Sequence, residues 1–233
     1  VREVDNIEPT AWACRWDAAG IGRWERECIQ CDSEPRHNGV QVTSTFVYRY
    51  QQSIQAITAW TYTLNNQGEM HLNVDVKLAD SLPPMARIGL ELELPFSAQS
   101  HQITWQGLGP FENYPDRLSA ARFGLYSQSL DDMHTPYIFP TDSGLRCGSK
   151  WLQVSGLEVS GDFLFSVSQF SQQQVAEAKH TNELVPEDKI YVRLDHQHMG
   201  VGGDDSWSPS VHPEFQLTEN QYMYSMILMP RLE

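Results

Sequence analysis

Apolar and polar residues alternate along much of the chain, with the period of two that half-buried β-strands show. The pattern is clearest around Asn65-Asn66-Gln67-Gly68. Trp60, Tyr62 and Leu64 alternate before this turn, and every second residue from 70 to 78 is apolar after it. A polar, glycine-containing turn between two alternating runs is typical of an antiparallel hairpin. The sequence therefore predicts two paired strands here.

The same alternation predicts strands at several further places along the chain. They are expected over residues 40–50, 88–94, 162–170 and 190–194, with a closing hairpin around Thr218-Glu-Asn-Gln221. Residues 118–126 are expected to form a strand or a brief helix.

Apart from the brief helix that residues 118–126 allow, helix is expected at two places. Residues 11–31 are expected to form a short helix or turn that leads into a strand through Cys28. Ser171-Gln-Gln-Gln174 has the form of a capping box that opens a short helix through Ala178.

Roughly a dozen or more short strands with very little helix favour an all-β fold in which two large antiparallel sheets pack face to face. The chain of 233 residues is long enough to bury one sizeable core. No repeat or low-complexity segment interrupts it. We therefore expect a single domain over residues 1–233.

Three long loops rich in glycine and proline separate the later strands, at residues 105–117, 137–148 and 198–209. In the third, the glycines permit backbone angles that other residues resist, and Pro209 restricts the exit. The loop is expected to be stiff and to be supported by these residues: His198, Gly202, Gly203, Asp204, Asp205 and Ser206.

Trp207 lies at the tip of the third loop, and two interpretations of it are open. A large flat ring with one N–H donor is suited to stacking on the apolar face of a sugar. Alternatively, the ring fills a core beneath the loop, as most tryptophans do.

The ordered strings GLGPFENYPDR (residues 107–117) and HMGVGGDDSWSPSV (residues 198–211) closely resemble the C-terminal small-chain domain of β-galactosidases of glycoside hydrolase family 2. The similarity runs from about Trp12 to near the C-terminus. It implies a lactose-cleaving, multi-domain enzyme of which this chain is one piece, with Trp207 helping to form the sugar site. It also implies the supersandwich fold that this domain shares with galactose mutarotases.

The resemblance also implies where the chemistry lies. Retaining glycoside hydrolysis needs two carboxyl groups roughly 5 to 5.5 Å apart. The family's two catalytic glutamates belong to a separate (β/α)₈ barrel domain, whose motifs this chain lacks. The Mg²⁺ and monovalent cation of the family enzyme are likewise expected outside it, so we expect no catalytic residue, metal or cofactor here. The expected partners are a β-galactoside and the other domains and subunits of a homo-oligomer.

Acidic and basic residues in the loops allow a catalytic interpretation or a structural one. Asp204 and Asp205 are adjacent in a tight loop, so their side chains are expected to diverge and cap the loop rather than act as a catalytic pair. Long loops must also satisfy their own backbone groups, which favours structural roles for the other charged residues. These are Asp116, Arg117, Asp131, Asp132, His134, Asp142 and Arg146.

Two other function classes remain open beside the β-galactosidase domain. A mutarotase-like aldose epimerase on the same fold would need a histidine and a carboxylate aimed at the sugar, roles that His134 and Glu112 would take. A stand-alone carbohydrate-binding module would rely on exposed aromatic rings. Neither alternative explains the length and order of the two strings.

Charge and composition exclude several other classes. A net charge of −14 repels phosphate backbones and anionic membranes, so nucleic acid and membrane surfaces are not expected partners. No apolar run approaches the length of a membrane span.

The four cysteines are too few for a disulfide framework and favour a reducing, cytoplasmic location. Cys28-Ile-Gln-Cys31 has the spacing of redox and zinc motifs. Residues three apart on a regular strand face opposite ways, however, so structural thiols are favoured over metal ligands.

The beginning of the chain gives one further expectation. It starts at Val1 with a polar stretch and lacks the Thr-Asp-Asn-type segment with which the family domain opens. We therefore expect a domain truncated at its N-terminus and taken from a longer polypeptide.

Overall fold

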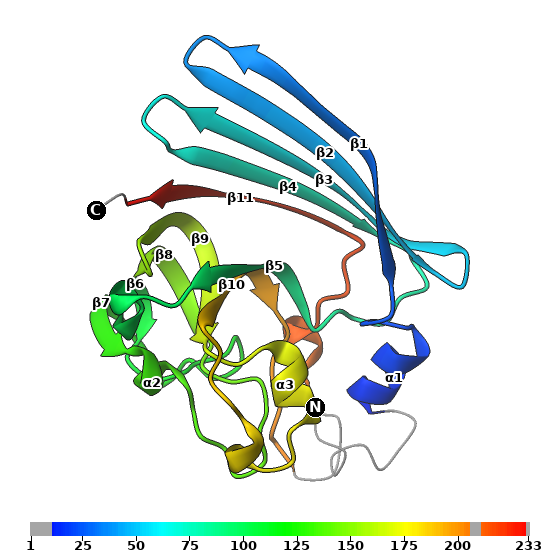
Figure 1. The fold of residues 1–233 in the computed structure, drawn as a ribbon. Coiled ribbons are helices and arrows are strands. Elements are labelled where there is room, and N and C mark those ends of the chain that lie inside the picture. Colours follow the sequence, from blue (N-terminus) through cyan, green and yellow to red (C-terminus); the bar gives the residue numbers. More distant parts are fainter. Residues whose placement is uncertain (1–10, 206–210, 232–233) are drawn as a thin grey trace.

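A computed structural model describes residues 11–205 and 211–231, and its strands lie in the two layers visible in Figure 1. The upper layer in that view contains β1 (Glu25–Arg36), β2 (Gly39–Tyr50), β3 (Ser53–Asn65), β4 (Met70–Leu78) and β11 (Gln221–Pro230). The lower layer contains β5 (Arg87–Pro95), β6 (Gln102–Gly109), β7 (Arg122–Ser129), β8 (Arg146–Val154), β9 (Leu157–Ser168) and β10 (Lys189–His198). The all-β prediction is confirmed.

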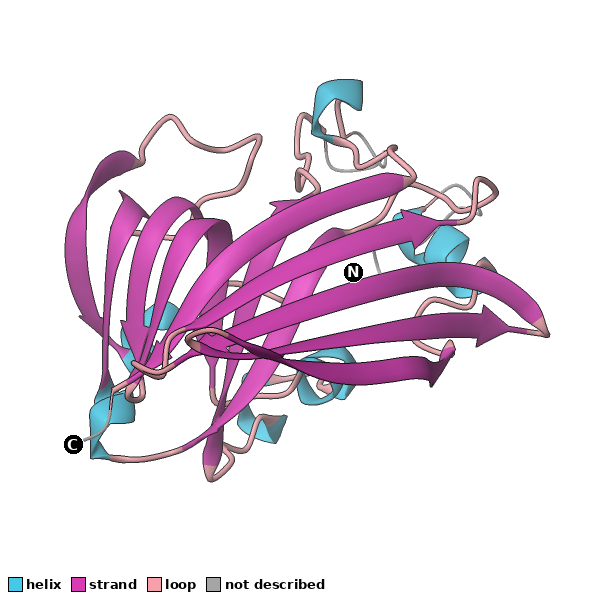
Figure 2. Cartoon of the chain, turned by 90° about the horizontal axis from the view of Figure 1, so that it is seen from above, coloured by secondary structure: helices cyan, strands magenta, loops and turns pink. Residues whose placement is uncertain are grey.

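All the strand pairs in the described residues are antiparallel, and hydrogen bonds connect the two layers into one sheet. The connection is β9, whose first half pairs with β11 and whose second half pairs with β10. Gly161, with φ +146°, lies at the change of partner. A glycine commonly marks the point where a strand bends from one layer to the other. The two sheets expected from the sequence are therefore joined along β9. Figure 2 shows the strands of both layers from above.

The helices are short and lie at the ends and edges of the sheet. They are α1 (Trp12–Ala18), α2 (Leu130–Met133) and α3 (Gln172–Glu177), with 3₁₀ turns η2 (Ala98–His101), η3 (Thr181–Glu183) and η4 (Pro213–Phe215). The expected cap of α3 is present, because the Ser171 hydroxyl accepts from the Gln174 N–H at 3.1 Å. In a full capping box the side chain of Gln174 would accept from the backbone N–H of Ser171. Here that side chain instead donates to Glu187.

Two expectations about the strands are wrong. The closing hairpin around Thr218-Glu-Asn-Gln221 does not form, because Leu217 bridges to Met85 and Phe215 belongs to η4. The first loop does not begin at Trp105, which lies within β6 and is completely buried. Glycines occupy positions 107 and 109 on the buried side of β6, and they hide its alternation in the sequence.

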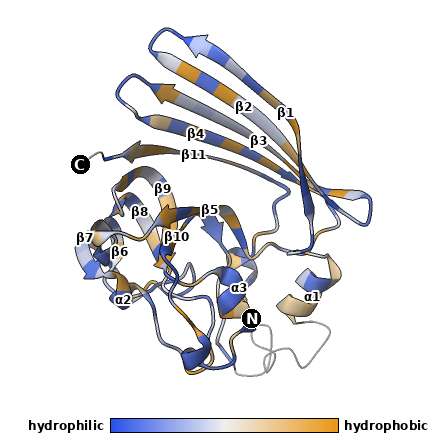
Figure 3. Ribbon diagram, in the orientation of Figure 1, coloured by the Kyte–Doolittle hydropathy of each residue, from blue (hydrophilic) through white to orange (hydrophobic). Residues whose placement is uncertain are grey.

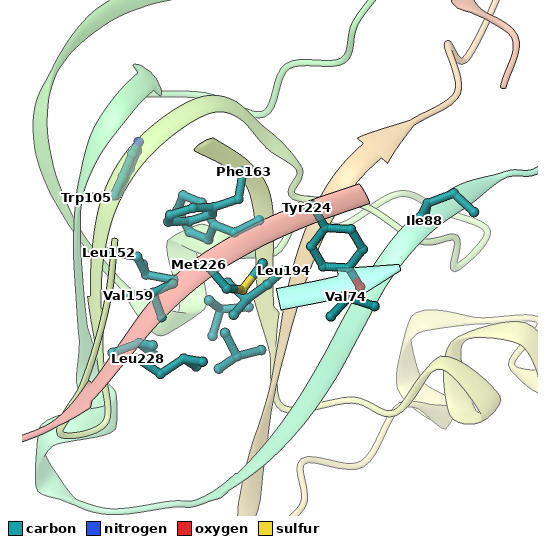
Figure 4. Packing of buried hydrophobic residues seen from close by; sticks show 14 of the residues in the cluster. Val74, Ile88, Trp105, Leu152, Val159, Phe163, Leu194, Tyr224, Met226 and Leu228 are labelled. Carbon is teal, nitrogen blue, oxygen red and sulfur yellow. The ribbon is translucent and has the colours of Figure 1, made fainter. Parts of the chain in front are cut away.

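The core lies between the two layers, and β1, at the exposed edge of the upper layer, contributes no residue to it. Figure 3 shows the alternation of apolar and polar residues along β2 and β4, and Figure 4 shows the apolar side chains meeting. Completely buried members come from the lower layer, and β4 and β11 add residues from the upper one. The labelled set in Figure 4 is Val74, Ile88, Trp105, Leu152, Val159, Phe163, Leu194, Tyr224, Met226 and Leu228.

The strand β1 forms an exposed edge of the upper layer and pairs only with β2 in the described residues. Its charged residues, Pro35 and a β-bulge at Ile29 discourage pairing with another strand. The bulge adds one residue, which shifts the alternation of every later side chain. Cys28 and Cys31 consequently face the same side of the sheet, and the expectation that they face opposite ways is wrong.

The contrast between two leucines tests the position of the core. Leu152 in β8 is completely buried and Leu125 in β7 is 72% exposed. Leu152→Ala should lower the free energy of unfolding by about 2–5 kcal/mol, because it leaves a cavity in the core. Leu125→Ala should change it by less than about 0.5 kcal/mol. Urea denaturation measures both, and equal losses would contradict the core described here.

Candidate functional site

The three long loops meet at one end of the lower layer, where side chains of one loop bind the backbone of the next. Glu112 in the first loop accepts hydrogen bonds from the hydroxyl of Tyr137 and, at 2.8 Å, from the N–H of Gly144. Both of these residues belong to the second loop. Glu112 also accepts from the hydroxyl of Tyr114 at 3.1 Å. This carboxylate therefore fixes the second loop onto the first.

Arg146, which begins β8, binds carbonyl groups from several of the surrounding turns. It is 2% exposed, and its guanidinium donates to the carbonyls of Gly144 at 2.8 Å and Met133 at 3.1 Å. It also lies 5.6 Å from the ring of Trp105. Burial lowers the pKa of Arg146 to about 10, although Glu112 opposes the change. At neutral pH the residue remains a charged structural donor.

Asp116 connects the first loop to the third, which carries the glycine-rich string. Its two carboxylate oxygens accept from the backbone N–H groups of Val201 at 3.1 Å and Gly202 at 2.8 Å. The neighbouring Arg117 donates to the carbonyl of Gly202 at 2.6 Å. Two consecutive residues of one family string therefore hold the backbone of the other.

The glycines of the third loop are required by this close approach. Gly202 and Gly203 have φ values of +67° and +110°, which other residues rarely adopt. A Cβ on Gly200 would lie 2.6 Å from a carboxylate oxygen of Asp116, closer than real contacts allow.

A buried ion-pair cluster lies beneath the loops, between β5 and β10. Asp195 is 2% exposed, and Arg87 donates to both its oxygens, at 3.2 and 3.1 Å from Nε. Arg87 also donates to Asp142 of the second loop at 2.7 Å. Although burial opposes its charge, these two carboxylates raise the pKa of Arg87 above its ordinary value. The cluster attaches the second loop to the strand that leads into the third.

His198 is the last residue of β10 and stands at the base of the third loop. Its Nδ1–H donates to the carbonyl of Met199 at 2.6 Å, and its ring lies 5.8 Å from the ring of Tyr114. Burial lowers its pKa, with Arg87 adding to the effect, so the imidazole is neutral at neutral pH. Its contacts are those of a structural residue.

Asp204 forms an ion pair with His212, which follows the tip of the loop. Both side chains are exposed, and the hydrogen bond to Asp204 raises the pKa of His212. Asp205 ends the described part of this loop. The other two residues singled out from the sequence, Ser206 and Trp207, lie outside the described residues.

The catalytic interpretations of the loop residues gain no geometric support. The glutamate of the mutarotase hypothesis, Glu112, is engaged by three donors, and His134 packs edge-on against Phe170 at 5.4 Å. Asp132 accepts from the hydroxyl of Ser129 within the cap of α2. Within the described residues, no group of three or more His, Cys, Asp and Glu side chains could hold a metal ion.

A hollow in the described surface lies elsewhere, between residues 78–85 and residues 217–220. It contains none of the loop residues named above. The anchoring roles of Glu112 and Asp116 toward particular backbone groups were missed from the sequence. No spacing rule relates Glu112 to Gly144, 32 positions away, or Asp116 to Val201, 85 positions away.

The ion pair between Asp204 and His212 gives a pH dependence that can be measured. A histidine whose pKa is raised on folding contributes stability below its unfolded value of about 6.5 and loses it as pH rises through the folded value. Titration followed by NMR should give His212 a pKa above 6.5, and Asp204→Asn should return it toward 6.5. An unchanged pKa in the variant would contradict this pairing.

Comparison with known proteins supports the family resemblance that the two loop strings indicate. Residues 3–228 match the family model described as β-galactosidase small chain. The chain is 72% identical over 231 residues to a β-galactosidase of Photobacterium profundum and 67% identical over 230 residues to one of Vibrio vulnificus. A β-galactosidase of Pseudoalteromonas haloplanktis is 54% identical over 228 residues. These matches cover 98–99% of this chain and 22% of each relative, so the chain spans about a fifth of their length.

Solved structures with similar outlines include a GalM/aldose epimerase homologue from C. elegans, with a TM-score of 0.41 and 11% identity over 89% of this chain and 68% of that one. A galactose 1-epimerase from Lactobacillus acidophilus gives a TM-score of 0.42 and 7% identity. The match covers 88% of this chain and 65% of that one. The family match and the identities confirm the resemblance found in the loop strings. The chain belongs to the β-galactosidase small-chain family.

Proposed function

We propose that this chain is a non-catalytic domain of a retaining β-galactosidase that hydrolyses terminal β-D-galactosides such as lactose. Its part in the reaction is to present the loop that carries Trp207 to the sugar. The tryptophan ring stacks on the sugar at the aglycone position, while other domains supply the chemistry.

The attachment of the third loop to the first is the observation that carries this proposal. Asp116 and Arg117 hold the backbone at Val201 and Gly202, and Asp204 pairs with His212. The backbone is therefore fixed a few residues before Trp207, and an ion pair spans the undescribed tip. A stacking ring contributes most to affinity when it is positioned before the ligand arrives.

The catalytic groups belong to the remaining part of the enzyme. Two carboxyl groups about 5 to 5.5 Å apart are needed for retention. The loop carboxylates described above accept from backbone N–H groups, hydroxyl groups, arginines or a histidine. The residues described here also do not fit the Mg²⁺ of the family enzyme, because they offer no cluster of three or more ligands. We assign that ion and the monovalent cation to other domains.

The surroundings of the chain follow from the same proposal. It packs against other domains of the polypeptide and contributes to the contacts of a homo-oligomer. The exposed rings of Phe111 and Phe123 and the exposed side chain of Ile138 supply apolar surface for such contacts.

A cytoplasmic location is supported by the four cysteines, which are all free. No helix among the described residues has the length and apolarity needed to cross a membrane.

Replacement of Trp207 in the full-length enzyme tests the role of the loop. Trp207→Ala should weaken the binding of glucose or lactose at the aglycone position by about 1 kcal/mol or more, roughly fivefold, and leave the fold unchanged. Inhibition constants and melting temperatures report the two effects. Trp105→Ala is the control for a core tryptophan and should cost about 3–5 kcal/mol of stability. A Trp207→Ala enzyme with a collapsed melting temperature and unaltered affinity would refute the stacking role.

The isolated chain should hydrolyse neither lactose nor a chromogenic galactoside, because we assign the pair of carboxyl groups that the reaction requires to another domain. The assay compares the purified chain with the full-length enzyme at equal molarity. Turnover that survives repeated purification and follows the chain through each step would contradict this.

A further inference from the structure

The Cys28-Ile-Gln-Cys31 motif lies on β1, the exposed edge strand of the upper layer, and takes no part in the proposed sugar site. Both thiols are free and both residues are exposed. The other two cysteines differ in this respect, since Cys147 is buried and Cys14 is half-buried. On this chain, the pair is therefore open to a ligand from solution.

The bulge at Ile29 determines how the two thiols are placed. Cys28 lies opposite Phe46 and Cys31 lies opposite Ser44, two residues apart on β2. Directly opposite residues in an antiparallel sheet project to the same face. The register continues across the layer in two rows on this inner face: Cys28, Phe46, Thr58, Val76, Tyr222 and Cys31, Ser44, Trp60, Val74, Tyr224.

The spacing of these rows permits the sulfur atoms of Cys28 and Cys31 to bind the same metal ion. Neighbouring residues on one face of a strand are roughly 6.7 Å apart at Cα. Two metal–sulfur bonds of about 2.3 Å span roughly 4.6 Å in a line. Each sulfur then needs to lean roughly 1 Å toward the other, which side-chain rotation of an exposed cysteine allows.

The chemistry of the inner face at β1 favours a soft ligand over a hard one. The carboxylates of β1 all lie on the other face, opposite the outward residues of β2: Glu25, Glu27, Asp32 and Glu34. The inner face of the strand carries Arg26 beside the cysteines, with its guanidinium 5.1 Å from the ring of Phe46. Calcium and magnesium prefer oxygen ligands, whereas thiolates select soft ions.

We propose that Cys28 and Cys31 form a two-coordinate site for a soft d¹⁰ metal ion such as Hg²⁺, Ag⁺ or Cu⁺. The two thiols each lose a proton, two metal–sulfur bonds form, and no oxidant or reductant is required. A structural zinc site would need four ligands. The described residues offer no group of three or more His, Cys, Asp and Glu, so the two sulfurs are the whole set.

The test is mercury(II) binding by the full-length polypeptide in competition with glutathione, a monothiol. Native protein should bind one more Hg²⁺ than the Cys28→Ser, Cys31→Ser double variant, as counted by native mass spectrometry. That ion should resist removal by glutathione, because the second sulfur acts at high effective concentration.

The matched control keeps two thiols on β1 but separates their faces. Cys31→Ser combined with Asp32→Cys moves the second thiol to the face that carries the carboxylates. This variant should lose its mercury at a glutathione concentration at least 100-fold lower than the native protein does. Circular dichroism confirms that it folds.

Deletion of Ile29 provides the converse control. It removes the bulge and leaves the cysteines two residues apart, so both stay on one face and mercury retention should be kept. Equal retention by the relocated pair, or loss of retention in the deletion variant with the fold intact, would overturn the proposal.

Discussion

The attachment of the third loop depends on one carboxylate, that of Asp116, which accepts the N–H groups of two consecutive residues, Val201 and Gly202. Backbone groups in a long loop have no strand partner, and leaving them unpaired away from water is costly. A carboxylate can satisfy two of them at once and tie two loops together. Gly200 must be a glycine for the carboxylate to approach. The same device recurs where Glu112 receives the second loop.

These loop contacts are possible because the strands beneath them are tightly connected. β9 pairs with β8, β10 and β11, so the strand that follows the second loop and the strand that precedes the third are held on either side of it. The ion pair of Arg87 with Asp195 adds a contact between β5 and β10. The two layers are thereby continuous, and the loop end of the molecule is fixed relative to the core.

The alternation of residues predicted most of the strands, because half-buried strands leave a period of two in the sequence. β6 was not predicted. One reason is that Gly107 and Gly109 occupy buried positions of this strand and have no apolar side chains. The shared face of the two cysteines depends on the bulge at Ile29, which a regular alternation does not reveal. The protein family was predictable from the two sequence strings at residues 107–117 and 198–211. The role of Asp116 was not, because its partners lie 85 and 86 residues away.

The most direct test of the account is a double-mutant cycle between Asp116→Ala and Trp207→Ala in the full-length enzyme, measured by the inhibition constant of glucose. If Asp116 acts by holding the loop that presents Trp207, the Asp116 variant should bind glucose more weakly. The double variant should then bind little worse than Trp207→Ala alone. Asp131→Ala, which changes an exposed carboxylate of α2 outside this contact, should have no effect. Strictly additive losses, or unchanged affinity in Asp116→Ala, would contradict the account.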